Sequence, residues 1–200
     1  MKQERTLSIE GKEYTLLISD EPQALLEAKA SGRAVLGCLD TGNGEGASRD
    51  FQGIPYVVPS MEYVTEELLE LILRRYLGLP WLIDETERLY IREFVKEDAE
   101  NIPEEEYGKE EEIFRDPDKL EVYIKNQYGF YEYGTWAVLK KSPSLLIGMA
   151  GASNPNLPET ALQALPTLPD DLCWLELGYH IFKTYRKNGY AKEAAIAILS

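Results

Sequence analysis

Residues 173–200 have the sequence CWLELGYHIFKTYRKNGYAKEAAIAILS, and this is the most informative stretch of the chain. The segment 173–182 is rich in apolar and β-branched or aromatic side chains and predicts a strand. A short polar loop that contains Gly189 follows, and the alanine-rich run after it predicts a helix. The sequence thus predicts a strand, a tight loop and a helix in direct succession.

This succession is a favourable place for an anion. The loop RKNGYA, residues 186–191, presents consecutive backbone N–H groups, and Gly189 lets the chain approach a ligand closely because it has no Cβ atom. The N-terminus of the helix adds its positive dipole end. Arg186 and Lys187 add positive charge at the mouth of the loop. We therefore expect a pyrophosphate group to bind here.

The same loop resembles the pyrophosphate-binding pattern Arg/Gln-x-x-Gly-x-Gly/Ala of the GNAT-type N-acetyltransferases, with Ala191 in the last place. The segment ELGYHIFKTYRKNGYAKEA is similar to the Rim-type branch of that family. The resemblance covers residues 88–200, because RLYIREFVKEDAENI resembles the first strand and helix, and TWAVLKK with SLLIGMAGAS resembles the second and third strands. It implies a mixed, mainly antiparallel sheet flanked by helices, within an α/β (α+β) chain.

The resemblance also implies an activity and a co-substrate. Such an enzyme transfers an acetyl group from acetyl-CoA to a primary amine of a small molecule or peptide by direct attack. The resemblance implies that main-chain groups pair with the pantetheine arm at His180, Ile181, Phe182 and Lys183. It implies that the pyrophosphate is held by backbone amides at Lys187, Asn188, Gly189, Tyr190 and Ala191, beside the charge of Arg186.

The predicted strand carries the candidate catalytic group. Glu176, Gly178 and His180 share one face because side chains alternate along a strand. The amine must lose a proton before it attacks, and many relatives have a glutamate on this strand, so Glu176 is the candidate base. A solvated or ion-paired glutamate fits this position equally well. His180, the one histidine of the chain, is better explained as a structural side chain.

In complete relatives, a fifth strand, another helix and two final strands follow the helix that here reaches Ser200. The tyrosine that many relatives use as general acid lies in that part, so we assign no general acid. We expect the chain to be a fragment of a longer protein, with completion by a second copy in a homo-oligomer, or by the N-terminal unit, as alternatives. A non-catalytic acyl-CoA-binding or regulatory module is the alternative function, and a plain basic turn without CoA affinity is a third interpretation.

The N-terminal part predicts a small Rossmann-like α/β unit over residues 1–84, followed by the GNAT-like domain over residues 85–200. Residues 14–77 weakly resemble the C-terminal part of haloacid-dehalogenase-type phosphatases, with Asp20 in the place of a metal-binding aspartate. The nucleophile strand of that family is missing from the match, so we expect a non-catalytic unit. Asp20 is then interpreted as a residue that satisfies free N–H groups at a helix start.

Composition limits the partners. A formal net charge of −14 argues against nucleic acid, which needs clustered Lys and Arg, and suits a cationic acceptor. Cys38 and Cys173 have no CxxC spacing, and with one histidine they predict no metal site. No stretch approaches the roughly 18 apolar residues of a membrane span, and the polar start MKQERTLSIEGKEY is unlike a secretion signal. We therefore expect a cytoplasmic protein with no membrane contact.

Overall fold

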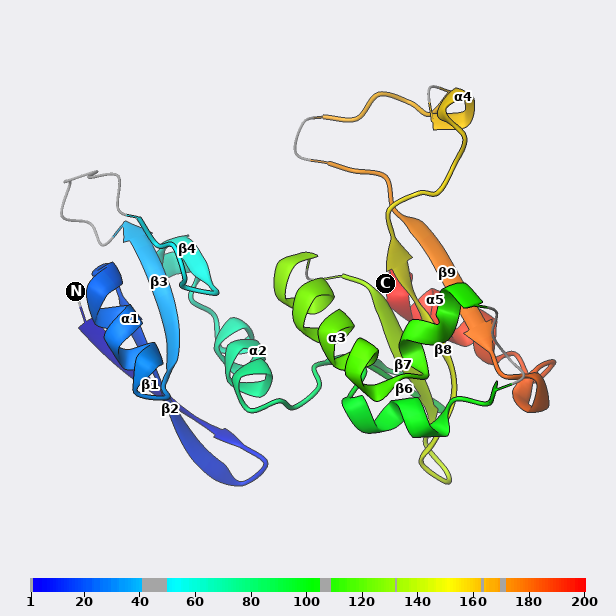
Figure 1. Ribbon diagram of the computed structural model, residues 1–200, viewed down its shortest axis with the longest axis horizontal. Helices are drawn as coiled ribbons and strands as arrows, with labels where there is room; N and C mark the ends of the chain where they lie inside the picture. Colours follow the sequence, from blue (N-terminus) through cyan, green and yellow to red (C-terminus); the bar gives the residue numbers. More distant parts are fainter. Residues whose placement is uncertain (1, 41–49, 105–108, 132, 163, 170–171) are drawn as a thin grey trace. The chain divides into compact units, whose positions relative to one another are not determined.

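The computed structural model describes residues 2–40, 50–104, 109–131, 133–162, 164–169 and 172–200 (Figure 1). The chain divides into two compact units, Met1–Trp81 and Leu82–Ser200. In the described residues each unit contains one sheet with helices packed on it, which confirms the predicted α/β class. The division falls between Trp81 and Leu82, whereas the sequence placed it after residue 84.

The first unit is a mixed sheet in the order β1-β2-β3-β4. Its elements are β1 (Lys2–Ile9), β2 (Lys12–Ser19), α1 (Pro22–Ala30), β3 (Ala34–Asp40), β4 (Val57–Ser60), the 3-10 helix η1 (Met61–Tyr63) and α2 (Glu66–Tyr76). β1 and β2 form an antiparallel hairpin whose turn has positive φ at Glu10 and Gly11. β2, β3 and β4 run parallel to one another.

Alternation along β2 distributes its side chains between two cores. Leu17 joins a cluster with Leu25 and Ala28 of α1, and Leu16 and Ile18 join a cluster on the α2 side. The three buried residues of α2 are Leu69, Ile72 and Leu73, and the Thr65 hydroxyl accepts the Leu68 N–H at the helix start.

Asp20 lies immediately before the N-cap of α1, and its role toward the N–H groups of the helix start stays a prediction. Glu21 occupies the N-cap position of α1, and Ser19 Oγ accepts its backbone N–H at 3.1 Å. Asp20 itself is 4% exposed. Asp20 therefore lies one position before the helix cap, in the interior of the first unit.

The second unit is an antiparallel sheet in the order β5-β6-β7-β8-β9. Its strands are β5 (Leu82–Glu85), β6 (Leu89–Arg92), β7 (Thr135–Lys140), β8 (Leu145–Ser153) and β9 (Glu176–Ile181). Its helices are α3 (Pro117–Tyr131), α4 (Glu159–Leu162), α5 (Tyr190–Leu199) and the 3-10 segments η2 (Lys96–Asn101), η4 (Lys109–Phe114) and η5 (Lys183–Tyr185). The predicted strand at 173–182 is shorter, and the predicted helix start at VKEDAENI is the 3-10 segment η2.

Two core clusters hold helices to this sheet. One includes Ile91, Val138 and Ile181 of the strands with Ala194 of α5. The other includes Met149 and Phe182 with residues of α3, η2 and η4. β9 is thereby fixed at the end of the sheet beside β8 (Figure 1). No helix among the described residues is both long enough and apolar enough to cross a membrane.

Candidate functional site

The segment after β9 makes two unusual backbone turns before α5 begins. η5 occupies Lys183–Tyr185, and Lys187 and Gly189 then adopt left-handed φ angles of 63° and 82°. A non-glycine residue rarely adopts such an angle, so the surrounding structure must favour it at Lys187. Left-handed residues in a turn direct successive N–H groups to one side and form an anion-binding concavity.

Gly189 is the N-cap of α5. Because glycine has no side chain, the cap residue offers no side-chain acceptor to the first amides of the helix. The first helical bond runs from the Glu193 N–H to the Gly189 carbonyl at 3.1 Å. The amides of Tyr190, Ala191 and Lys192 precede that bond and have no acceptor within the helix. These amides and the helix dipole are therefore available to an anion.

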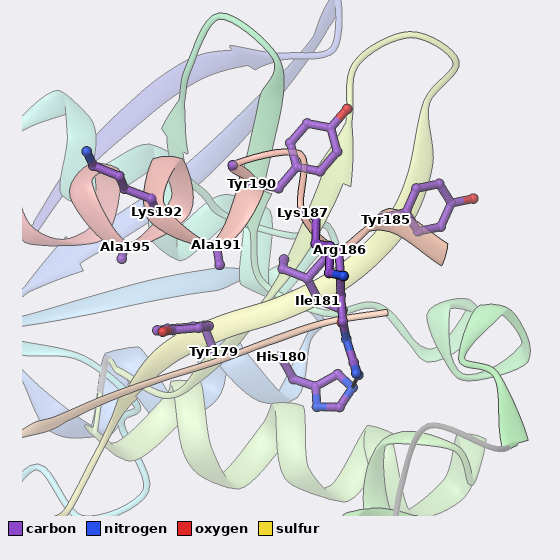
Figure 2. Close-up of a pocket in the computed structure, with 11 residues that line it drawn as sticks. Tyr179, His180, Ile181, Tyr185, Arg186, Lys187, Tyr190, Ala191, Lys192 and Ala195 are labelled. Atoms are coloured by element: carbon purple, nitrogen blue, oxygen red, sulfur yellow. Dashed lines mark hydrogen bonds between the residues drawn. The ribbon is translucent and has the colours of Figure 1, made fainter. Parts of the chain in front are cut away.

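A cavity of about 680 Å³ opens at this end of α5 (Figure 2). Its lining residues come from β9, the loop and one side of α5: Tyr179, His180, Ile181, Tyr185, Arg186, Lys187, Gly189, Tyr190, Ala191, Lys192 and Ala195. Ala191 and Ala195 face Tyr179 across it in Figure 2, and their small side chains keep the space between helix and strand open.

The loop is held from inside by Asn188. Its side-chain amide donates to the carbonyls of Tyr185 at 3.1 Å and Arg186 at 3.0 Å. Asn188 does not line the cavity, so its side chain shapes the loop while its neighbours contact the open space.

The free edge of β9 offers main-chain groups in alternation. The Phe182 N–H donates to the Ile147 carbonyl at 2.9 Å, so Phe182 and, two residues earlier, His180 direct their main-chain groups to β8. Ile181 and Tyr179 direct theirs to the other side, where no strand among the described residues pairs with β9. Phe182 is 2% exposed, and Lys183 lies beyond the strand in η5. Among the four predicted pantetheine contacts, Ile181 is thus the residue whose main-chain groups point to the open side of β9.

Arg186 points back along β9 rather than out of the loop. Its Nε atom donates to the Ile181 carbonyl at 2.7 Å, and Nη2 lies 3.2 Å from Nε2 of His180 (Figure 2). The guanidinium group is exposed and still lines the cavity. His180 therefore has a structural neighbour in Arg186, and the positive charge of Arg186 lies over the end of β9.

Glu176 lies at the opposite end of β9 from the loop. Its side chain is exposed, and Oε2 accepts the backbone N–H of Asn156 at 3.2 Å. Glu176 lies five positions before Ile181 along the strand, which corresponds to roughly 16 Å. Glu176 therefore does not line the cavity. A ligand bound at the loop would have to extend along the length of β9 to reach it.

Residues from the start of the unit complete the site. Arg88 Nε donates to Glu193 at 2.7 Å, and Arg88 Nη1 donates to the Asn188 carbonyl at 3.0 Å. The hydrogen bond to Glu193 raises the pKa of Arg88. Burial alone would raise the pKa of Glu193, but hydrogen bonds from Thr86 and Arg88 outweigh it and lower the pKa.

Sequence reasoning missed several of these residues. Tyr179, Tyr185, Lys192 and Ala195 line the cavity. Strand alternation and helical spacing relative to Ile181 and Ala191 could have found Tyr179 and Ala195. Arg88 has no local signal, because only the fold brings it to the loop. Within the described ranges, no group of three or more His, Cys, Asp or Glu side chains is placed to hold a metal ion.

Comparison with known proteins shows the family of the chain. The sequence matches the acetyltransferase (GNAT) domain over residues 88–200. A crystal structure of an acetyltransferase from Agrobacterium tumefaciens str. C58 is similar at 20% identity and a TM-score of 0.35. That similarity covers 58% of this chain and 63% of the solved chain. The search of curated proteins found no match. Since the domain match spans more than half of the chain and includes β9, the loop and α5, the chain belongs to the GNAT acetyltransferase family.

Proposed function

We propose that the second unit transfers an acetyl group from acetyl-CoA to a primary amine of a small molecule or peptide, in the manner of the Rim-type branch. The observation that carries the proposal is the uncapped N-terminus of α5 behind the left-handed turns at Lys187 and Gly189, open to a cavity of about 680 Å³. This arrangement suits a pyrophosphate.

The rest of the co-substrate would follow β9. Its pantetheine arm has amide groups that can pair with the outward main-chain groups of Ile181 and Tyr179, as a strand pairs with a sheet edge. Binding of the Ile181 carbonyl would compete with the 2.7 Å bond from Arg186 Nε. The arm would extend from the loop toward the end of β9 that bears Glu176.

In the proposed reaction the neutral amine attacks the thioester carbonyl carbon. The new C–N bond forms, the C–S bond breaks, and the CoA thiolate leaves and takes up a proton. Glu176 would accept the proton that the amine loses, through water where the distance requires it. Its carboxylate is exposed and accepts the Asn156 N–H at 3.2 Å, so it is accessible to the water that such a transfer would use.

The net charge of −14 favours a cationic acceptor, because an acidic surface attracts such molecules. We propose a non-catalytic role for the first unit, because its resemblance to the phosphatases omits their nucleophile strand. We also propose a cytoplasmic location for the protein.

The direct test is to incubate the purified chain with acetyl-CoA and a panel of primary amines, and to follow free thiol release. Release that depends on one class of amine, and that falls at least about tenfold in Glu176→Gln, is the expected result. CoA binding without release for any amine would instead support a non-catalytic acyl-CoA-binding module. Undiminished release in Glu176→Gln would remove Glu176 from the role of base.

A further inference from the structure

A group of side chains joins the beginning of the second unit to the end of the chain. Thr86 Oγ1 donates to Glu193 at 2.6 Å, and the Arg88 backbone N–H donates to the same carboxylate at 3.2 Å. Arg88 reaches the other carboxylate oxygen through Nε at 2.7 Å and also through Nη2. We call Thr86, Arg88 and Glu193 the loop brace.

The loop brace contacts the candidate pyrophosphate loop directly. Arg88 Nη1 donates to the Asn188 carbonyl at 3.0 Å, and its guanidinium carbon lies 4.6 Å from the centre of the Tyr190 ring. A Cβ atom on Gly189 would lie 3.5 Å from Arg88 Nη2. Arg88 therefore contacts Asn188 and the Tyr190 ring, and it lies beside Gly189 between them.

The loop brace also balances the negative charge of Glu193 near the loop. Glu193 lies in the first turn of α5, where a carboxylate competes with a bound anion for the helix dipole. Its side chain is 19% exposed, and its charge is matched by Arg88, whose Nε and Nη2 atoms both donate to Oε2 of Glu193. The carboxylate is thus directed to Arg88 and Thr86, and the loop amides remain open.

We infer that Arg88 and Glu193 are positioning residues for the co-substrate, which act by holding the loop in the conformation that presents its amides to the pyrophosphate. The inference rests on the proposed function, since it concerns the same loop. Arg88 acts through the Asn188 carbonyl and the Tyr190 ring and needs its planar fork for both, so a lysine cannot replace it.

The test compares CoA with pantetheine, which lacks the pyrophosphate. We expect Arg88→Lys, which keeps the charge, to raise the Kd for CoA about tenfold and to leave pantetheine binding, followed by NMR titration, unchanged. Glu193→Gln should act in the same direction. Because the two side chains act as one unit, their effects should not add. The Kd for CoA of the double variant Arg88→Ala, Glu193→Ala should not exceed the higher of the two Kd values of the single alanine variants.

The matched control is Arg74→Lys in the first unit, where Arg74 Nε contacts Glu70 at 2.7 Å. It should leave the Kd for CoA unchanged. If Arg88→Lys had the wild-type Kd for CoA, Arg88 would supply only charge. The inference would then be overturned, while the proposed function would stand. Equal weakening of CoA and pantetheine would overturn it in favour of a general structural role. Absence of CoA binding by the wild-type chain would overturn the proposed function together with the inference.

Discussion

At the scale of single residues, Gly189 has a backbone conformation that a substitution would disturb. Its φ of 82° favours glycine, while a Cβ atom would meet its nearest neighbour at an ordinary contact distance of 3.5 Å. We expect Gly189→Ala to lower the free energy of unfolding by about 1 kcal/mol through backbone strain alone. The Kd for CoA should rise as well, because the loop amides rotate with the backbone. Urea unfolding and calorimetry measure the two effects.

The control for that change is Gly129→Ala. Gly129 lies in α3, its φ is not positive, and an added Cβ atom would meet nothing within 4 Å. Alanine is the better helix former, so the free energy of unfolding should rise by about 0.5 to 1 kcal/mol with no change in CoA binding. Stabilisation by Gly189→Ala as well would show that the left-handed turn is not a constraint.

Glu193 gives stability a pH dependence with a definite sign. Its pKa is lowered in the folded protein, because the hydrogen bonds from Thr86 and Arg88 outweigh burial. Such a carboxyl stabilises the fold above its unfolded pKa, about 4.3, and loses this contribution as the pH falls through the folded value. Glu193→Gln should therefore destabilise the protein more near pH 7 than near pH 3 in urea unfolding. The same loss at both pH values would contradict a role for the charge.

At the scale of elements, β8 and β9 approach closely at Gly148. A Cβ atom there would overlap the His180 carbonyl oxygen and lie 2.8 Å from the Ile181 Cα atom. We expect Gly148→Ala to push β9 away and to cost about 1 to 3 kcal/mol of unfolding free energy. Gly178→Ala on β9 is the control, since its Cβ atom would meet nothing within 4 Å. Similar losses in both variants would mean that the close approach is not needed.

The elements also show what the sequence could predict. β9, the loop and α5 were predicted because their patterns are local: apolar side chains in a strand, a glycine in a tight turn and alanines in a helix. β5 was not predicted, because LIDE has only four residues, two of them acidic, and becomes a strand only by pairing with β6. β1 was missed for the same reason, since most of its side chains are exposed and its partner is β2.

The candidate site follows the same division. Local residues of the loop, such as Lys187 and Gly189, were predicted and line the cavity. Arg88 and Glu193 are joined only by the fold, so neither residue's neighbours in the sequence indicate the contact. The orientation of Arg186 toward His180 likewise depends on side-chain geometry, which a pattern of residue types does not contain.

At the scale of the whole molecule, the chain contains two units with separate cores. The features that support acetyl transfer, namely the cavity, the uncapped helix and the free edge of β9, all lie in the second unit. The first unit has a buried acidic residue, Asp20, directly after β2.

Calorimetric titration of the full chain with acetyl-CoA, CoA and ATP tests the central claim, that the loop at 186–191 and the start of α5 hold the pyrophosphate of CoA. Acetyl-CoA and CoA share the pyrophosphate and the pantetheine arm, so both should bind with similar Kd values at one site per chain. ATP lacks the arm and should bind far more weakly. Heat from neither CoA ligand, in a sample shown to be folded by circular dichroism, would contradict the account.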